Sequence, residues 1–427
     1  MLSTYEMGRQ PFGLASPAAW LRNAGHEVTA IDLTRARLPA GMPPADMVCL
    51  YLPMHTATRL ALKLIPKLRA LHPEAHFCAY GLYAPLNETV LRESGIQSIV
   101  GGEFEQGLLD LAAGGATEPI SLARQRFQIP DRATLPALNS YAQLIDGPVT
   151  RTTGYTEATR GCKHLCRHCP VVPVYQGTFR VVQREIVLAD IRQQVESGAR
   201  HITFGDPDFF NGSTHARVIV EALHVEFPHI TYDVTIKIEH LLKHRDLIPV
   251  LRATGCAFAV SAVESIDDQL LALLEKGHTR KDFLEALSLM RAAGLPLAPT
   301  FIPFTPWTTM EGFRDLLRLI AAEDLIPNVP PIQMGIRLLI PEGSRLLELP
   351  EVREFVGPFD PAKLVYPWQH PDPAMDTLSV KIQSLAKSKA TRAEIFAQIW
   401  EAAHCGNLDM PLAGRATVPY LNEPWYC

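Results

Sequence analysis

The feature of this sequence that most limits its fold is a regular alternation of short apolar segments with longer amphipathic ones. In residues 1–112, strand-like apolar segments alternate with helical patterns; the strand-like segments are 26–33, 46–53, 76–81 and 98–102. Strands that alternate with helices form parallel sheets with right-handed crossovers. We therefore predict a doubly wound parallel sheet over residues 1–112, with any ligand at the carboxyl ends of its strands.

The alternation stops at residues 113–150, which contain the segment AAGGATEP and several prolines and which we predict to be a linker. It resumes with longer units, and we predict six strands, at 155–161, 201–206, 230–239, 257–265, 295–304 and 330–341. Six such units are too few for a full eight-unit barrel, so residues 151–344 are predicted to form a partial (β/α)6 barrel. Residues 345–427 are predicted to be a mostly helical extension with a proline- and aromatic-rich tail. The fold class is therefore α/β.

Composition excludes several functions. Charged residues make up 20% of the chain and the formal net charge is −5, whereas nucleic-acid-binding proteins normally carry a basic footprint. No apolar run approaches the roughly 18–20 residues that span a bilayer, and the first residues lack the pattern of a signal peptide. We expect a cytoplasmic protein that binds neither nucleic acid nor a membrane.

Three of the eight cysteines lie together, as Cys162-x3-Cys166-x2-Cys169, directly after the first predicted barrel strand. Iron–sulfur clusters are held by cysteine thiolates, usually four, and three thiolates on one loop leave one iron open for a ligand. The alternative is a structural zinc ion with His164 or His168 as the fourth ligand. Zinc motifs more often pair two short knuckles, and no second knuckle follows here.

This spacing after the first strand of a six-unit βα chain resembles the radical S-adenosylmethionine (radical SAM) superfamily, over about residues 155–341. The resemblance implies that Cys162, Cys166 and Cys169 hold a [4Fe–4S] cluster. It further implies that the fourth iron binds S-adenosylmethionine (SAM), and that one electron cleaves the sulfonium. The implied partners are a small-molecule substrate and a one-electron reductant of the flavodoxin or ferredoxin type.

The resemblance also implies a SAM site at the ends of the next strands. Gly205, Asp206 and Asp208 stand where the family has a glycine-rich segment with an acidic residue that contacts the SAM ammonium. An ordinary turn with a helix N-cap would use the same residues. In the third strand, period-two alternation would place Lys237 and Glu239 on one face, where they would hold the ribose and carboxylate of SAM or, at an edge, meet water.

Three further residues complete the expected SAM site. Glu264 ends the fourth strand in a Glu-Ser pair that resembles a SAM-binding segment of the family. His168, before the third cysteine, takes the place of an aromatic residue near the adenine. Arg337 interrupts the apolar sixth strand, where a guanidinium could bind a carboxylate or form an internal ion pair.

The domain before the barrel resembles the cobalamin-binding architecture found within this superfamily. The usual Asp-x-His-x-x-Gly signature is missing, and residues 5–10 (YEMGRQ) take its place. Cobalamin could bind without a histidine ligand, or the domain could serve only to pack on the barrel. A cobalamin-dependent radical SAM methyltransferase is therefore an alternative function, and a non-catalytic metal-binding scaffold is an alternative of another class.

The chain ends in NEPWYC, and this tail resembles that of radical SAM proteins ending in Cys-Sec-Ala-Glu-Pro or Cys-Cys-Ala-Glu-Pro. By this resemblance the chain stops one residue short of a selenocysteine, and Cys427 is a catalytic candidate. A vicinal pair of soft donors would suit trivalent arsenic. The resemblance extends to the radical SAM enzymes of arsinothricin biosynthesis, which implies transfer of the 3-amino-3-carboxypropyl group of SAM to arsenic.

Overall fold

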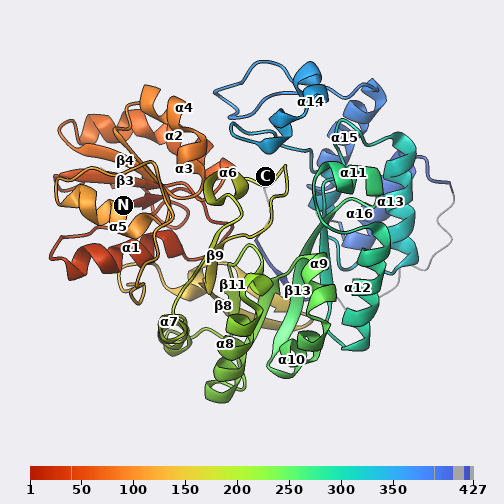
Figure 1. Cartoon of the computed structure of the whole chain (residues 1–427), viewed down its shortest axis with the longest axis horizontal. Coiled ribbons are helices and arrows are strands. Elements are labelled where there is room, and N and C mark those ends of the chain that lie inside the picture. Colours follow the sequence, from red (N-terminus) through yellow and green to blue (C-terminus); the bar gives the residue numbers. More distant parts are fainter. Residues whose placement is uncertain (40, 389, 407–417, 424–427) are drawn as a thin grey trace.

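The computed structural model describes every residue except 40, 389, 407–417 and 424–427, and it contains two large sheets (Figure 1). The first sheet, with its helices, lies at one end of the molecule, and the second lies beside it. A two-stranded antiparallel pair between them carries the chain into the cysteine loop. No helix among the described residues has the length and apolar character needed to cross a bilayer.

The first sheet has six strands in the order β2-β1-β3-β4-β5-β6, all parallel, which confirms the predicted doubly wound sheet. Its strands are β1 (Leu2–Ser3), β2 (Ile31–Asp32), β3 (Met47–Tyr51), β4 (His76–Tyr80), β5 (Ser98–Gly102) and β6 (Ile120–Ser121). Helices α1 (Phe12–Asn23) and α5 (Phe104–Ala112) pack on one face, and α2 (His55–Leu71) and α4 (Glu88–Glu93) pack on the other. The short helix α3 (Tyr83–Leu86) follows β4.

The second sheet has seven strands in the order β14-β13-β12-β11-β8-β7-β15. Five of them run parallel: β8 (Val149–Thr156), β11 (His201–Phe204), β12 (Thr231–Thr235), β13 (Cys256–Glu264) and β14 (Leu297–Phe301). Two antiparallel strands, β7 (Gln143–Asp146) and β15 (Tyr420–Leu421), extend the edge beside β8. This curled sheet confirms the predicted partial barrel, although β8 begins inside the segment predicted to be a linker.

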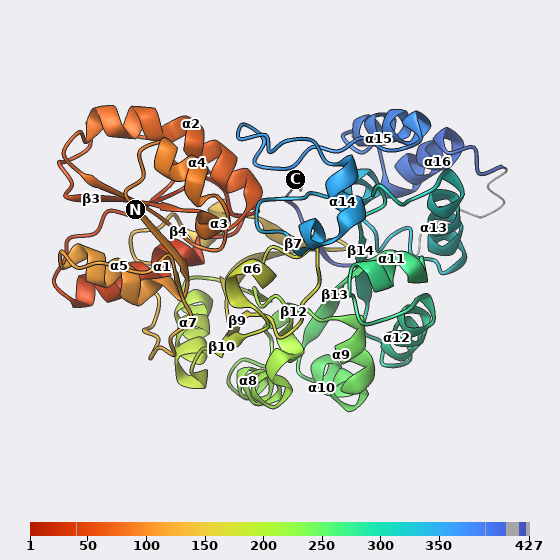
Figure 2. The ribbon, with the colours of Figure 1, turned by 45° about the horizontal axis from the view of Figure 1, so that its top comes forward.

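Helices follow the parallel strands and cover the outside of the second sheet, and Figure 1 shows α7, α8, α10, α12 and α13 in succession. The helices of this part are α6 (Val172–Tyr175), α7 (Arg184–Glu196), α8 (Ser213–Glu226), α9 (Ile238–Lys243), α10 (Ile248–Ala253), α11 (Asp268–Leu273), α12 (Arg280–Ala292) and α13 (Met310–Ala322). The C-terminal helices are α14 (Pro350–Phe355), α15 (Pro373–Leu385) and α16 (Arg392–Ala402). Figure 2 shows α15 and α16 beside α13, remote from the first sheet.

Two predicted strands differ from the structure. The sixth, 330–341, is a 3-10 helix over Pro331–Gly335 followed by one isolated parallel bridge between Phe304 and Arg337. Pro330 and Pro331 have no backbone N–H to donate to a ladder, which disfavours a regular strand at the start of this segment. The third strand ends at Thr235, and the chain then turns into helix α9, which buries Ile238 and Leu241.

The prediction that Lys237 and Glu239 share one strand face is therefore wrong. Lys237 stands at the N-cap position of α9, and Glu239 lies in its first turn. The last ladder hydrogen bond runs from the Ile236 N–H to the Val260 carbonyl at 2.9 Å. Beyond it, the buried apolar side chains of α9 decide the conformation rather than the alternation read from the sequence.

The antiparallel pair β9 (Thr159–Gly161) and β10 (Phe179–Val181) brings Arg160 against the first sheet. The Arg160 guanidinium, 6% exposed, donates to both carboxylate oxygens of Glu105 at 2.7 and 2.8 Å and to Glu157 at 2.6 Å. A third carboxylate, Glu103, lies 3.7 Å away and accepts a hydrogen bond from the Tyr175 hydroxyl at 3.0 Å. The junction of the two sheets is thus a buried ionic network.

Three carboxylates around one guanidinium carry more negative than positive charge. Burial of Glu103, together with the neighbouring Glu105, raises the pKa of Glu103 to about 7 although Arg160 opposes the shift. An acid whose folded pKa lies above its ordinary value of 4.5 destabilises the fold increasingly as pH rises from 4.5 to 7.

We expect Glu103→Gln to gain stability relative to the native chain as the pH rises from 5 to 7.5. The variant gains stability because the amide avoids the cost of ionising a buried carboxyl group. That cost is up to about 3 kcal/mol at roughly 1.4 kcal/mol per pKa unit. Thermal unfolding at the two pH values measures it, and Glu88→Gln, in an exposed pair with Arg92, is the control. If the difference in unfolding midpoint between the variant and the native chain were the same at both pH values, Glu103 would be ionised in the folded protein at both.

Candidate metal and cofactor site

The three clustered cysteines lie on the loop that follows β9, at the carboxyl end of the barrel strands. Gly161, just before Cys162, has a φ of +74°, and a Cβ there would lie 2.3 Å from the Tyr175 ring, so only glycine fits. Cys162 and Cys169 pack against an apolar group that joins α6 to the first domain, formed by Leu82, Tyr83, Leu86, Leu122, Val171, Val174 and Tyr175. The cysteine loop is therefore anchored to both sheets.

The environment of the sulfur atoms suits an anionic metal centre. Burial raises the pKa of Cys169 to about 12 and also raises that of Cys162. Both side chains are therefore protonated thiols near neutral pH, and a metal that binds them displaces their protons. The ammonium group of Lys237 lies 3.7 Å from the Cys166 sulfur. Lys276 carries a second buried ammonium: burial alone would lower its pKa, but Glu264 and the nearby sulfur of Cys166 outweigh burial and raise it. The two cations complement thiolates, so the residues present fit an iron–sulfur cluster.

Glu264, at the end of β13, forms a buried array with His168 and Lys276. One carboxylate oxygen lies 3.1 Å from His168 Nε2 and accepts a hydrogen bond from Lys276 Nζ at 3.2 Å. Burial alone would raise the pKa of Glu264, but Lys276 and His168 outweigh it and lower the pKa to about 2. The structure therefore holds a charged carboxylate next to the cysteine loop, to which His168 belongs.

The backbone of Glu264 is strained. Its φ of +67° lies in the left-handed region, and the pairing of β13 with β14 shifts register between Ala262 and Glu264. Such strain in a non-glycine residue costs about 1–3 kcal/mol and clusters at ligand-binding sites. The bulge turns the end of β13 out of the ladder at the position where the sequence analysis expects a ligand contact.

The segment Gly205–Asp208 has two different structural roles. Asp206 accepts hydrogen bonds from the Ala158 N–H at 3.0 Å and from the Thr159 hydroxyl at 2.6 Å, so both oxygens position the start of β9. A Cβ on Gly205 would lie 1.8 Å from the Tyr155 hydroxyl, so this glycine makes room for a ring. Burial raises the pKa of Asp206 to about 7.

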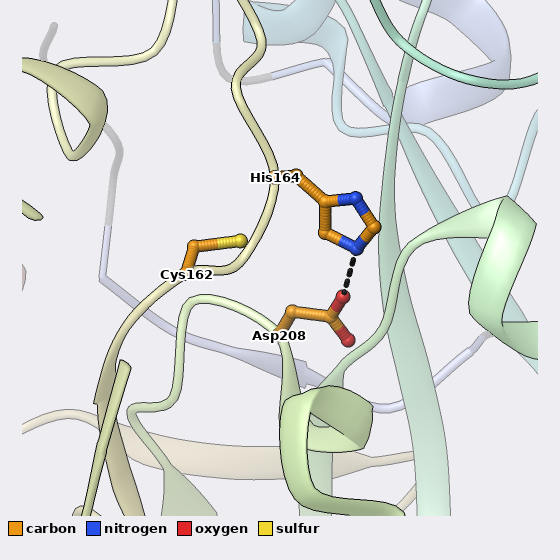
Figure 3. A group of neighbouring side chains, drawn as sticks. All are labelled: Cys162, His164 and Asp208. Carbon is orange, nitrogen blue, oxygen red and sulfur yellow. Dashed lines mark ion pairs between the residues drawn. The ribbon is translucent and has the colours of Figure 1, made fainter. Parts of the chain in front are cut away.

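Asp208 is the N-cap of the 3-10 helix Phe209–Gly212, and it also contacts two histidines. His240 Nδ1 lies 2.6 Å and His164 Nε2 3.5 Å from Asp208 Oδ2. Burial alone would raise the pKa of Asp208, but these two histidines hold it well below its usual range. Figure 3 shows His164 and Asp208 facing each other with the Cys162 sulfur beside them. The ligand atoms of Cys162, His164 and Asp208 all lie within 4.8 Å of one another. A single metal ion, the alternative to a cluster, would therefore bind between these three residues.

Sequence reasoning missed several residues of this region. His240, Lys276 and His278 come from α9 and from the loop after α11, segments without a recognisable motif. His278 is 6% exposed, and neither ring nitrogen has a hydrogen-bond partner in the described part of the chain. Burial and the nearby Lys276 and Lys237 lower its pKa to about 4, so its ring is neutral at pH 7. In the sequence, the signal that could have indicated Lys276 and His278 is the polar run KGH, which follows the helix after the fourth predicted strand.

Of three other predicted site residues, Arg337 lies apart from this array, Glu239 lies at its edge, and Cys427 lies outside the described structure. Arg337 forms an ion pair with Asp376 and lies over the Trp368 ring at 3.8 Å, so the internal ion pair is the alternative that the structure contains. Glu239 is half-exposed and lies 3.6 Å from the Lys237 ammonium group and 3.5 Å from His164 Nδ1. Cys427 falls outside the described residues.

In a comparison with known families, residues 156–320 match the model described as the Radical SAM superfamily. A tRNA-2-methylthio-N(6)-dimethylallyladenosine synthase of Desulfosudis oleivorans is 28% identical over 218 residues, 47% of this chain and 45% of that protein. The hopanoid C-3 methylase of Methylococcus capsulatus is 24% identical over 322 residues, 70% of this chain and 62% of that protein. The chain thus spans less than two thirds of the length of either relative.

Two solved structures share the fold over most of the chain. The cobalamin-dependent SAM radical enzyme OxsB, with aqua-cobalamin and SAM bound, has a TM-score of 0.66 at 15% identity and covers 93% of this chain and 69% of its own. The radical SAM methyltransferase TsrM of Kitasatospora setae, with tryptophan and a SAM analogue bound, has a TM-score of 0.67 at 16% identity. It covers 89% of this chain and 86% of its own.

The cluster and the single-ion alternatives predict different metal contents. If the three cysteines hold a cluster, Cys169→Ala should lose iron and sulfide, because it removes a thiolate ligand, whereas His164→Ala should keep both. Iron, sulfide and zinc analysis of anaerobically reconstituted protein measures the difference. Zinc that binds to Cys169→Ala but not to His164→Ala would assign the group in Figure 3 as a single-ion site.

Proposed function

We propose, on the premise that residues 156–320 form a radical SAM domain, that this chain is a radical SAM enzyme that reductively cleaves SAM and transfers a group to a second small molecule. The observation that carries the proposal is the array at the carboxyl ends of the barrel strands. It places three clustered cysteines, two buried ammonium groups and the charged Glu264 in one region of the matched domain. A non-catalytic scaffold would have no need of a strained, buried carboxylate beside its metal ligands.

In this proposal Cys162, Cys166 and Cys169 hold a [4Fe–4S] cluster, with a one-electron reductant of the flavodoxin or ferredoxin type as its partner. The cluster, when bound, supplies the electron that breaks a carbon–sulfur bond of SAM. Glu264 accepts a hydrogen bond from the ammonium group of SAM, and Lys276 and His168 keep that carboxylate charged and oriented. Asp206 holds the strand that leads into the cysteine loop.

We expect Glu264→Gln to weaken SAM binding by at least about tenfold without loss of the cluster. The amide keeps the size of the side chain but removes the charge, and a hydrogen bond to a charged group contributes about 1.5–3 kcal/mol. Isothermal titration with SAM measures the affinity, and iron content reports the cluster. Glu226→Gln, in a surface pair with Arg192, is the matched control. An unchanged affinity for SAM would give Glu264 a purely structural role.

For the transferred group we propose 3-amino-3-carboxypropyl, with trivalent arsenic as the acceptor. The support is the cysteine-ending tail, which together with the opening residues 3–28 resembles the CUAEP/CCAEP-tail proteins. The described part of the tail belongs to the barrel: β15 pairs antiparallel with β7, and Val418 is buried. Catalytic use of Cys427 remains part of this proposal, and its position lies outside the described residues.

The products of SAM cleavage test this choice. Transfer of the 3-amino-3-carboxypropyl group breaks the bond from the sulfonium to the methionine γ-carbon and leaves methylthioadenosine. The other cleavage leaves methionine and, after hydrogen transfer, 5′-deoxyadenosine. We expect methylthioadenosine from reduced enzyme incubated with SAM and arsenite, measured by chromatography, with Cys427→Ser forming less alkylated arsenic. 5′-Deoxyadenosine as the main product would exclude the aminocarboxypropyl transfer.

Cobalamin-dependent methyl transfer is the second candidate, because OxsB and the methyltransferase TsrM, which share this fold, have both been solved with cobalamin bound. The first domain of this chain does not fit a cobalamin whose nucleotide tail is buried against α1. Tyr51, Tyr80 and Phe104 pack together there with ring centroids 5.3–6.0 Å apart, and a Cβ on Gly13 of α1 would lie 2.1 Å from the Tyr51 ring. Cobalt analysis after reconstitution with cobalamin tests this second candidate.

A further inference from the structure

A cavity of 630 Å³ lies against the inner face of the barrel sheet. Strands β12, β13 and β14 form one wall through Asp233, Val260 and Thr300. The opposite side is closed by the 3-10 helix Pro331–Gly335, by the start of α16 and by the tail residues 418–423. Its size is that of a small-molecule site.

Asp233 presents an unused carboxylate oxygen to this cavity. The residue is 5% exposed, and its Oδ1 accepts a hydrogen bond from the Thr203 hydroxyl at 2.6 Å and lies 2.9 Å from His201 Nε2. His201 is itself held by the Thr231 hydroxyl, 2.8 Å from Nδ1. Oδ2 makes no hydrogen bond within the described part of the chain. A buried carboxylate fixed through one oxygen is suited to bind an amine through the other.

Arg392, at the start of α16, presents a guanidinium to the same cavity. It lies over the Tyr420 ring at 4.8 Å and donates one hydrogen bond, to the Pro327 carbonyl. No carboxylate pairs with it among the described residues, and burial lowers its pKa. Gln333, 2% exposed, also lines the cavity, and its side chain makes no hydrogen bond in the described structure. A partly buried guanidinium that no carboxylate of the described residues pairs with is suited to bind a carboxylate bidentately.

Between these groups the cavity wall is apolar. Phe258 and Val260 of β13, Ala298 of β14 and Val418 of the tail line it. Arg9, Lys387 and Glu423 also contribute to the lining, so the cavity has charges of both signs. A ligand that combines an ammonium group, a carboxylate and an apolar skeleton would complement this lining.

We propose that this cavity binds a small zwitterion of the α-amino acid type. Asp233 binds its ammonium group, Arg392 binds its carboxylate, and the Phe258–Val260–Ala298 wall contacts its side chain. This binding site does not rest on the proposed function. The tail residues 418–423 form part of the wall, which links the C-terminal segment to recognition of the ligand.

The test is a binding screen with the twenty common L-amino acids at millimolar concentration, followed by titration calorimetry with each one that binds. The full chain is used without SAM. The N-acetyl derivative of a binder removes its ammonium group, and the methyl ester removes its carboxylate, so each derivative isolates one of the two proposed contacts. We expect at least one amino acid to bind and both of its derivatives to fail.

Three variants locate the site. Asp233→Asn and Arg392→Gln should each weaken binding by about tenfold or more, because each removes a charge-assisted hydrogen bond. Ala298→Leu should block binding by filling the cavity without changing its charge. Asp246→Asn, on the exposed surface before α10, is the matched control and should bind as the native chain does. Circular dichroism confirms that each variant is folded.

SAM also carries an ammonium group and a carboxylate, so competition separates the two sites. We expect the amino acid to bind equally with and without saturating SAM, and Asp233→Asn to leave SAM affinity unchanged. Binding that SAM displaces, binding that survives Asp233→Asn and Arg392→Gln, or no binding by any amino acid would overturn the inference. Amino acid binding in a protein that fails to cleave SAM would instead uphold the site and overturn the proposed function.

Discussion

The structure depends on one buried guanidinium. Arg160 lies between the two sheets, within 5.5 Å of the ring centroids of Phe12, Phe104 and Phe127, and its ion pairs reach Glu105 of α5. Because Arg160 stands two residues before Cys162, the same contacts that join the domains also place the cysteine loop. Removing one partner from such a network leaves a charge in a low-dielectric interior, which is far more costly than losing a surface pair. The first domain is therefore part of the support of the metal site.

A second set of buried charges defines the site itself. Lys276 and His168 surround Glu264, and Lys237 approaches Cys166, so positive charge is concentrated where thiolates and a carboxylate lie. Each of these groups would be costly to bury alone, and each lowers the cost of burying its neighbours. The left-handed backbone of Glu264 shows that the surrounding packing imposes this arrangement against a local conformational preference.

The sequence was sufficient for the features that depend on residues close together in the chain. Cys162, Cys166 and Cys169 lie within eight residues and share one loop of the structure, as their spacing predicted; that this loop binds a metal stays a prediction. The alternation of segments predicted the parallel sheets, and their order predicted the partial barrel. The alternation of residues was misleading where packing overrides the local pattern. It suggested a strand through Lys237 and Glu239, but this segment is a helix because Ile238 and Leu241 are buried in the core.

What only the tertiary structure decided is which distant side chains share a site. The sequence proposed Asp206 and Asp208 as equivalent candidates, but one holds the turn into β9 and the other contacts His164 and His240. Asp233 and Arg392 are 159 residues apart and carry no motif, yet they line one cavity because the chain returns to the barrel at α16. Local patterns record the period of a strand or helix, whereas the meeting of remote charges depends on how the elements pack, and packing is a property of the whole chain.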